Sequence, residues 1–187
     1  MKTILSVILS LAMIPLFAAA MIEPAIPAKE VVQEASSPSE RYYSSDGKYS
    51  IAFPAQWELA ADLDESSIAG ISPREDGQDF FRENVLIGSF DLTTTDNLDD
   101  YFQGNLEYLQ RQIGDIEVES QERVEIDGQE AIKLIYSSTI SNTRVKTVQV
   151  FLLRDGRGYI ITAMAMEPAF EAFKEEFGEI IKSFRFE

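Results

Sequence analysis

Alternating apolar and polar residues occupy most of the chain after residue 41, a pattern with the period of β-strands. In residues 48–53 every second residue from Tyr49 to Phe53 is large and apolar, and Pro54 ends the run. Further strands are predicted over residues 58–60, 67–72, 84–92, 116–126, 129–138, 143–153 and 159–166. The later strands follow one another through tight-turn pairs, Asp127-Gly128, Ser141-Asn142 and Asp155-Gly156. The pattern therefore predicts a sheet built mainly from antiparallel hairpins.

Two of these strands carry information about their place in the sheet. Residues 159–166 are apolar on both faces, which is typical of a strand covered on both sides. Residues 116–126 instead alternate apolar residues with charged and polar ones, including Glu119, Arg123 and Glu125. A charged outer face is typical of a strand near a sheet edge.

Helical spacing appears twice. In residues 97–113 the apolar residues recur every three or four positions, with Thr95 or Asp96 as the expected N-cap and Gly114 as the closing residue. The second helix is expected to begin at Pro168 and to present a stripe of phenylalanines toward the sheet. Since the strand at 159–166 needs cover on both faces, we expect an α+β domain with helices on both faces of the sheet.

The N-terminus reads as an export signal. Lys2 precedes an apolar run from Ile4 to Phe17, and three alanines ending at Ala20 supply small residues for cleavage. We therefore expect a signal peptide at residues 1–20, with an uncleaved membrane anchor as the alternative. Residues 21–41, rich in Pro, Glu, Ala and Ser, are expected to form a flexible linker, and residues 42–187 the folded domain.

Composition narrows the chemistry. The chain has 16 basic and 32 acidic residues and a formal net charge of −16, so it repels phosphate backbones and nucleic acid is not expected as a partner. It contains no Cys and no His. Disulfides, thiol nucleophiles and a Ser-His-Asp triad are thereby excluded within this chain. Any metal site would rely on carboxylate oxygens, which suit Ca²⁺, Mg²⁺ or Mn²⁺.

One acidic cluster precedes the predicted strand at 84–92. Asp76, Asp79 and Glu83 could offer oxygen ligands to a hard cation. The alternative is a solvated loop in which Arg82 pairs with a local carboxylate and Asn84 hydrogen-bonds to the backbone. The sequence leaves both interpretations open.

Several motifs together resemble one known family. They are the run YSIAFP ending at Pro54, then Trp57, then FFRENV with Phe81, Arg82 and Asn84, a helix beginning NLDDYF at Asn97, and the final phenylalanine-rich helix. Over residues 42–187 this layout is similar to the PsbP-like family, which includes the bacterial DcrB-type proteins. The resemblance implies an α/β/α sandwich with a central antiparallel sheet.

The resemblance also implies a class of function. Members include extrinsic photosystem II subunits of the thylakoid lumen, linked to calcium and manganese retention, and a bacterial envelope protein. We therefore expect an exported, non-catalytic accessory protein in the periplasm, the extracellular space or a thylakoid lumen. It would be a monomer without a membrane span in its mature form, and it would bind a protein or a membrane protein complex. The alternative is a Ca²⁺- or Mn²⁺-binding module; no other cofactor is expected, and an enzyme is not expected.

Overall fold

The computed structural model describes residues 39–60, 67–74, 80–92 and 97–187. Its strands are β1 (Ser39–Tyr43), β2 (Tyr49–Pro54), β3 (Glu58–Leu59), β4 (Ser67–Ile71), β5 (Asn84–Asp91), β6 (Glu117–Ile126), β7 (Gln129–Ile140), β8 (Thr143–Arg154), β9 (Arg157–Met166) and β10 (Arg185–Phe186). Its helices are α2 (Leu98–Ile113) and α3 (Phe170–Lys182).

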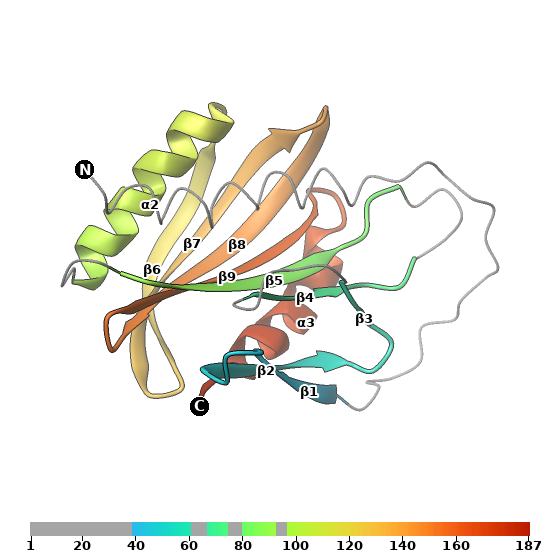
Figure 1. Ribbon diagram of the computed structural model, residues 1–187. Coiled ribbons are helices and arrows are strands. Elements are labelled where there is room, and N and C mark those ends of the chain that lie inside the picture. Colours follow the sequence, from blue (N-terminus) through green and yellow to red (C-terminus); the bar gives the residue numbers. More distant parts are fainter. Residues whose placement is uncertain (1–38, 61–66, 75–79, 93–96) are drawn as a thin grey trace.

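In these ranges the strands form a three-stranded sheet, ordered β1-β2-β10, and a seven-stranded sheet, ordered β3-β4-β5-β9-β8-β7-β6 (Figure 1). Every strand pairing in the described ranges is antiparallel. The prediction of an α+β fold on a mainly antiparallel sheet is confirmed. The charged strand β6 lies at an edge of the larger sheet, as its sequence predicts.

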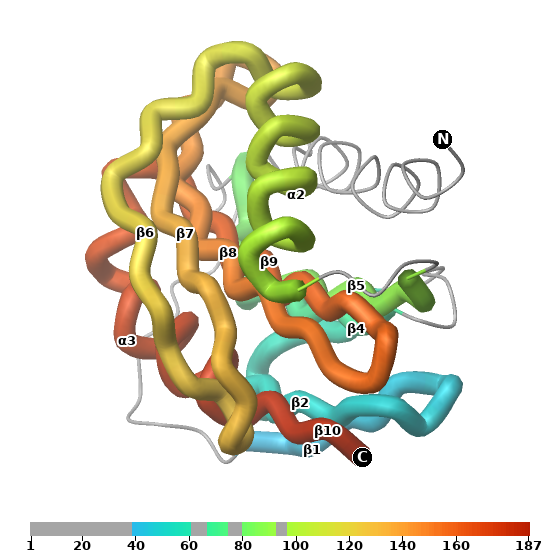
Figure 2. The backbone as a smooth tube through the Cα atoms, turned by 90° about the vertical axis from the view of Figure 1, so that its left-hand side faces the viewer, coloured from blue at the N-terminus to red at the C-terminus, as the bar shows by residue number. Residues whose placement is uncertain are grey.

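Strand β9 lies at the centre of the larger sheet, between β5 and β8, and its residues 158–165 are all buried. Its odd-numbered apolar residues join a core cluster that contains the buried side chains of α3, while Ile160 and Met164 join a second cluster with those of α2. In Figure 2, α3 lies to the left of the long strands and α2 to the right. The expectation that 159–166 is buried on both faces is confirmed for residues 159–165, whereas Met166 is half-buried.

The smaller sheet closes the α3 side of the core. Tyr49, Ile51 and Phe53 of β2 are fully buried in the cluster that includes α3. Trp57 stacks on Phe53, with ring centroids 6.1 Å apart, and its indole Nε1 donates to Glu176 Oε1 at 2.9 Å. Through ring stacking and this hydrogen bond, Trp57 links the end of β2 to α3.

Some element ends differ from the sequence prediction. Asn97 is the N-cap of α2, and its Oδ1 accepts a hydrogen bond from the Asp100 backbone N at 3.0 Å. Thr95 and Asp96 lie outside the described residues. Helix α3 begins at Phe170 with Ala169 as its N-cap, so Pro168 lies in the preceding turn and not in the first helical turn. Gly114 closes α2 as predicted, with φ of 81°.

Strand β1 begins at Ser39, inside the stretch expected to be linker. It pairs with β2, and Arg41 donates from Nη1 to Ser50 Oγ at 2.8 Å and from Nη2 to the Ser183 carbonyl at 3.0 Å. The rest of the predicted linker and the predicted leader at residues 1–20 lie outside the described residues. None of the helices in the described ranges is long and apolar enough to cross a membrane.

Replacing Gly70 of β4 with alanine should destabilise the domain. A Cβ built at Gly70 would lie 2.5 Å from the ring of Phe53, which is fully buried and cannot move away freely. We expect a loss of about 1–3 kcal/mol in urea unfolding, the usual cost of overpacking. The matched control is Gly104→Ala on the exposed face of α2, where a Cβ meets nothing within 4 Å. That change should stabilise by up to about 1 kcal/mol, and an equal loss in both variants would contradict the packing.

Replacing Glu176 with glutamine should raise stability at neutral pH. Partial burial raises the pKa of Glu176, although the hydrogen bond from Trp57 opposes this. A carboxyl whose pKa is higher in the folded state than in the unfolded state disfavours folding once ionised, and the penalty vanishes as pH falls below the unfolded value. Glutamine keeps the acceptor oxygen without the charge. The gain, measured by urea unfolding, should disappear below about pH 4; a gain that persists there would contradict the explanation.

Candidate functional site

The predicted cation cluster is only partly described. Asp76 and Asp79 lie outside the described residues. Glu83 is 2% exposed, so its carboxylate lies inside the fold and not on a solvated loop. Its Oε2 lies 3.4 Å from the donor Ser72 Oγ, and its carbonyl accepts from the Ser72 backbone N at 2.8 Å. Within the described ranges, no group of three or more carboxylates that could hold a metal ion occurs. The cation site stays a prediction.

The neighbours of Glu83 fasten strands together. Arg82 donates from Nε to the Ser72 carbonyl at 2.6 Å and from Nη1 to Glu58 Oε2 at 2.9 Å. Within the described ranges its carboxylate partner therefore comes from β3, 24 positions earlier in the chain. Asn84 donates from Nδ2 to the Arg82 carbonyl at 3.0 Å. These contacts join β3, the end of β4 and the start of β5.

The remaining motif residues lie in the core. Pro54 is the last residue of β2, and its carbonyl accepts from the Trp57 backbone N at 2.9 Å. Phe81 is fully buried and belongs to the cluster on the α2 side of the sheet. Pro54, Trp57 and Phe81 thus hold the fold together and do not line the recess described next.

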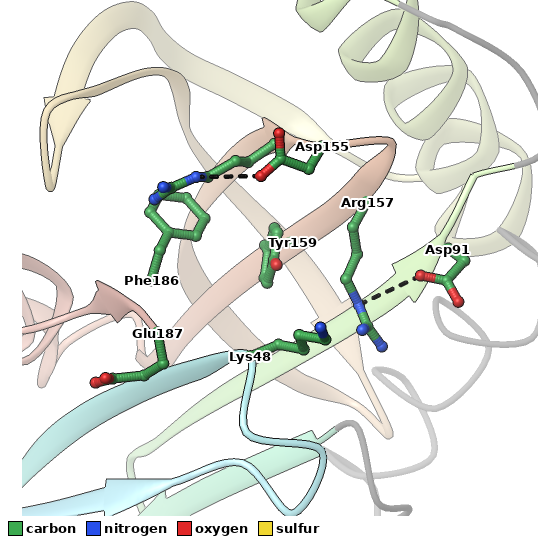
Figure 3. A pocket seen from close by; sticks show the side chains of 8 residues that line it. Lys48, Asp91, Asp155, Arg157, Tyr159, Phe186 and Glu187 are labelled. Carbon is green, nitrogen blue, oxygen red and sulfur yellow. Dashed lines mark ion pairs between the residues drawn. The ribbon is translucent and has the colours of Figure 1, made fainter.

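A recess of about 190 Å³ opens where the smaller sheet meets the end of the larger one (Figure 3). The residues that line it, which we call the cationic recess, are Lys48, Asp91, Arg154, Asp155, Arg157, Tyr159, Phe186 and Glu187. They come from four segments of the chain: the residue before β2, the end of β5, the β8–β9 hairpin with the start of β9, and the end of the chain at β10. Three of these eight residues are cationic and three are acidic, in a chain whose net charge is −16.

The β8–β9 hairpin positions the two arginines. Its turn residues, Asp155 and Gly156, have positive φ angles of 52° and 74°, as a two-residue hairpin turn requires. Arg154 and Arg157 are direct partners across the hairpin, and Arg157 also pairs with Asp91 of β5. Directly opposed residues point to the same face of a sheet. All three side chains therefore meet at the same end of the larger sheet.

The Arg157 guanidinium is partly neutralised but not fully hydrogen-bonded. Its Nη2 lies 2.8 Å from Asp46 Oδ2, and its Nε lies 3.7 Å from Asp91 Oδ1. The second distance is an ion pair beyond hydrogen-bond range. In the part of the chain that the structure describes, the buried Nε has no hydrogen-bond acceptor.

Aromatic side chains form the floor of the recess. The Arg154 guanidinium lies over the Phe186 ring, 4.7 Å from its centroid. Tyr159 packs edge-on against Phe186 with centroids 5.1 Å apart, and it is 4% exposed. Burial raises the pKa of Tyr159, while the nearby Arg157 charge lowers it in part. The phenol therefore stays protonated at neutral pH and keeps a proton to donate.

Lys48 supplies the remaining cation. It is exposed at the start of β2, and within the described ranges its ammonium has no ion-pair partner. Figure 3 shows the Lys48 ammonium and the Arg157 guanidinium pointing toward one another. Two cations that face each other attract an anion between them.

A second surface is the outer edge of β6, which we call the acidic edge: Glu117, Glu119, Glu122 and Glu125. These four side chains are exposed, and Val118 beside them is 48% exposed. Glu122 pairs with Lys133 at 2.9 Å, Glu117 with Arg144 and Glu119 with Lys146. Exposed ion pairs of this kind contribute little to stability, so a partner can replace them.

Sequence reasoning predicted the edge strand but missed the recess. The charged outer face of 116–126 was enough to place β6 at an edge. The recess depends on pairing between β5, β8 and β9 and on the return of β10, which no local pattern reveals. The one usable signal was a pair of arginines flanking the Asp155-Gly156 turn, because residues on either side of a two-residue turn must face each other.

Solved structures of other proteins have a similar architecture. The solution structure of CyanoP, the cyanobacterial PsbP of Synechocystis, has a TM-score of 0.62 at 15% identity, over 82% of this chain and 95% of that one. The Ran-binding protein Mog1p of Saccharomyces cerevisiae has a TM-score of 0.59 at 12% identity, over 80% of this chain and 96% of that one. LpqN of Mycobacterium tuberculosis, involved in cell envelope biogenesis, has a TM-score of 0.57 at 13% identity, over 80% of this chain and 90% of that one.

At these identities the similarity shows a shared fold. No curated protein sequence matches the chain. The sequence profile of the PsbP-like protein family matches residues 3–186, nearly the whole length. The chain belongs to the PsbP-like protein family.

Proposed function

We propose that this protein is an exported, non-catalytic binding protein that attaches to a protein complex in the cell envelope or at a membrane. The acidic edge of β6 is the surface that makes this attachment. A basic patch on the partner protein would meet it.

The position and length of β6 carry this proposal. The strand has 10 residues and pairs with β7 on one side only, since it is the last strand of the larger sheet. In the described ranges its other edge has no strand partner. Backbone groups along such an edge and the glutamates beside them offer both hydrogen bonds and charge to a partner. The irregular pairing at Val118 and Ser120 keeps the edge from being a flat template for self-association.

Family membership supports a binding role. Proteins with this fold include one that binds Ran and one involved in cell envelope biogenesis, and they provide examples of the fold outside enzymes. The recess adds hydrogen-bond donors and an aromatic floor. The expected leader at residues 1–20 supports export, and the negative charge suits a protein that recognises cationic surfaces.

Neutralising the acidic edge should weaken attachment. The test uses a triple variant that carries Glu119→Gln, Glu122→Gln and Glu125→Gln. This variant and the wild-type protein are each immobilised as bait and exposed to the membrane fraction of the source organism. The matched control replaces Glu171, Glu175 and Glu179, three exposed glutamates of α3, with glutamine. Each triple variant removes the same charge. We expect the edge variant to retain about tenfold less of the wild-type partner, and the control to retain it nearly fully.

Quantitative mass spectrometry of the retained proteins is the measurement, repeated at higher ionic strength. Wild-type retention should fall as salt rises, because exposed charges are screened. Equal retention by both variants would contradict a role for the acidic edge. Equal loss in both variants would show that overall charge, and not this strand, controls the attachment.

The alternative function is a Ca²⁺- or Mn²⁺-binding module that uses Asp76, Asp79 and Glu83. The buried position of the Glu83 carboxylate favours testing it, because hard cations bind oxygen ligands held by the fold. If this alternative holds, calorimetric titration with either ion should give saturable heat, which Asp79→Asn should weaken by about tenfold or more. A flat titration at millimolar metal would remove the alternative and leave the binding role unaffected.

A further inference from the structure

The cationic recess is lined by three cations and three carboxylates, and some of its donors have no acceptor in the described ranges. The Lys48 ammonium has no ion pair in the described ranges, and the Arg157 Nε has no hydrogen-bond acceptor there. The Tyr159 hydroxyl has no hydrogen-bond partner among the described residues, although its ring is packed on several sides. Of these three groups the Arg157 Nε is the buried donor without an acceptor, and because such a donor is costly it favours a ligand that accepts hydrogen bonds.

The three carboxylates that line the recess do not accept hydrogen bonds from these donors. Asp91 is 86% exposed and remains 3.7 Å from Arg157, and Asp155 is 91% exposed beside Arg154. Glu187 accepts a hydrogen bond from Ser50 Oγ through its Oε1, at 2.5 Å. The Arg157 Nη2 is paired with Asp46, so the donors that remain available to an incoming anion are the Arg157 Nε and those of Lys48 and Tyr159.

Size and charge limit which anion fits. At about 190 Å³ the recess is smaller than the usual 300–1,000 Å³ of drug-sized pockets, so it suits one small group. Asp91 and Asp155 at its rim repel a dianion such as phosphate more than a singly charged group. The Phe186 and Tyr159 rings give an apolar wall beside the donors, against which a short hydrocarbon stem can pack.

We propose that the cationic recess binds a monoanionic carboxylate with an apolar stem. Lys48 and Arg157 donate hydrogen bonds to the carboxylate oxygens, and Tyr159 donates to them from the floor of the recess. The apolar stem packs on the Phe186 ring. This site is separate from the acidic edge, and it stands whether or not β6 is the attachment surface.

The test is a titration followed by two-dimensional ¹⁵N–¹H NMR, with 3-phenylpropionate as probe and its neutral amide, 3-phenylpropionamide, as the matched control. The acid should shift the amide signals of Arg157 and Tyr159 saturably, with a Kd on the order of millimolar. Phosphate should bind at least about fivefold more weakly than the acid. Equal effects of the acid and its amide, or of the acid and phosphate, would overturn the proposal, as would the absence of saturable shifts.

Two variants test whether 3-phenylpropionate binds at this recess. Lys48→Gln removes an exposed cation that holds no ion pair in the described ranges, so the fold should survive. It should weaken 3-phenylpropionate binding about five- to tenfold. Lys174→Gln, an exposed change on α3 with the same loss of charge, should leave binding unchanged. Unchanged binding in Lys48→Gln, or an equal loss in both variants, would overturn the assignment of the site.

A blocked acidic peptide, acetyl-Ala-Glu-Ala amide, identifies the source of the carboxylate. Tighter binding of the peptide than of 3-phenylpropionate would support the proposal and assign the ligand to an acidic side chain of a protein partner. Tighter binding of 3-phenylpropionate would support it with a free organic acid as the ligand.

Discussion

The burial of β9 on both faces is the constraint on which the rest of the structure depends. A strand whose residues 158–165 are all buried cannot leave either face of its sheet in water. Apolar residues of β9 belong to two core clusters, one of which contains buried side chains of α3 and the other buried side chains of α2. The same strand turns back from β8 at Asp155 and Gly156, so its position also determines where Arg154 and Arg157 project. The cationic recess is thus a consequence of how the centre of the sheet is built.

Charge is distributed unevenly over this scaffold. Glutamates of the acidic edge face lysines and arginines of β7 and β8, which keeps an exposed edge strand soluble without hiding its backbone. The cationic recess lies at the junction of the two sheets, where Lys48 and the hairpin arginines meet an aromatic floor. A chain with a net charge of −16 therefore presents both an acidic edge and a recess where three cations lie among three carboxylates.

Local patterns predicted much of this fold. The alternation in β2, the hairpin turns at Asp127, Asn142 and Asp155 and the edge position of β6 follow from side-chain period and turn chemistry. Strand β1 was missed because Ser39, Glu40 and Arg41 carry no apolar alternation, and it is the pairing with β2 that makes them a strand. The Glu58 partner of Arg82 was missed for a similar reason, since Glu58 reaches it only after β3 and β4 pair. The cationic recess was not predictable, because four separate segments form it.

Hydrogen–deuterium exchange of the protein, alone and bound to the complex that it captures from its own membrane fraction, tests the central claim most directly. Binding through the acidic edge predicts slower exchange of the β6 backbone amides in the complex, with the amides of α3 unchanged. Unchanged exchange along β6 together with new protection on α3 would contradict the claim, because the attachment surface would then lie on α3 and not on the edge strand.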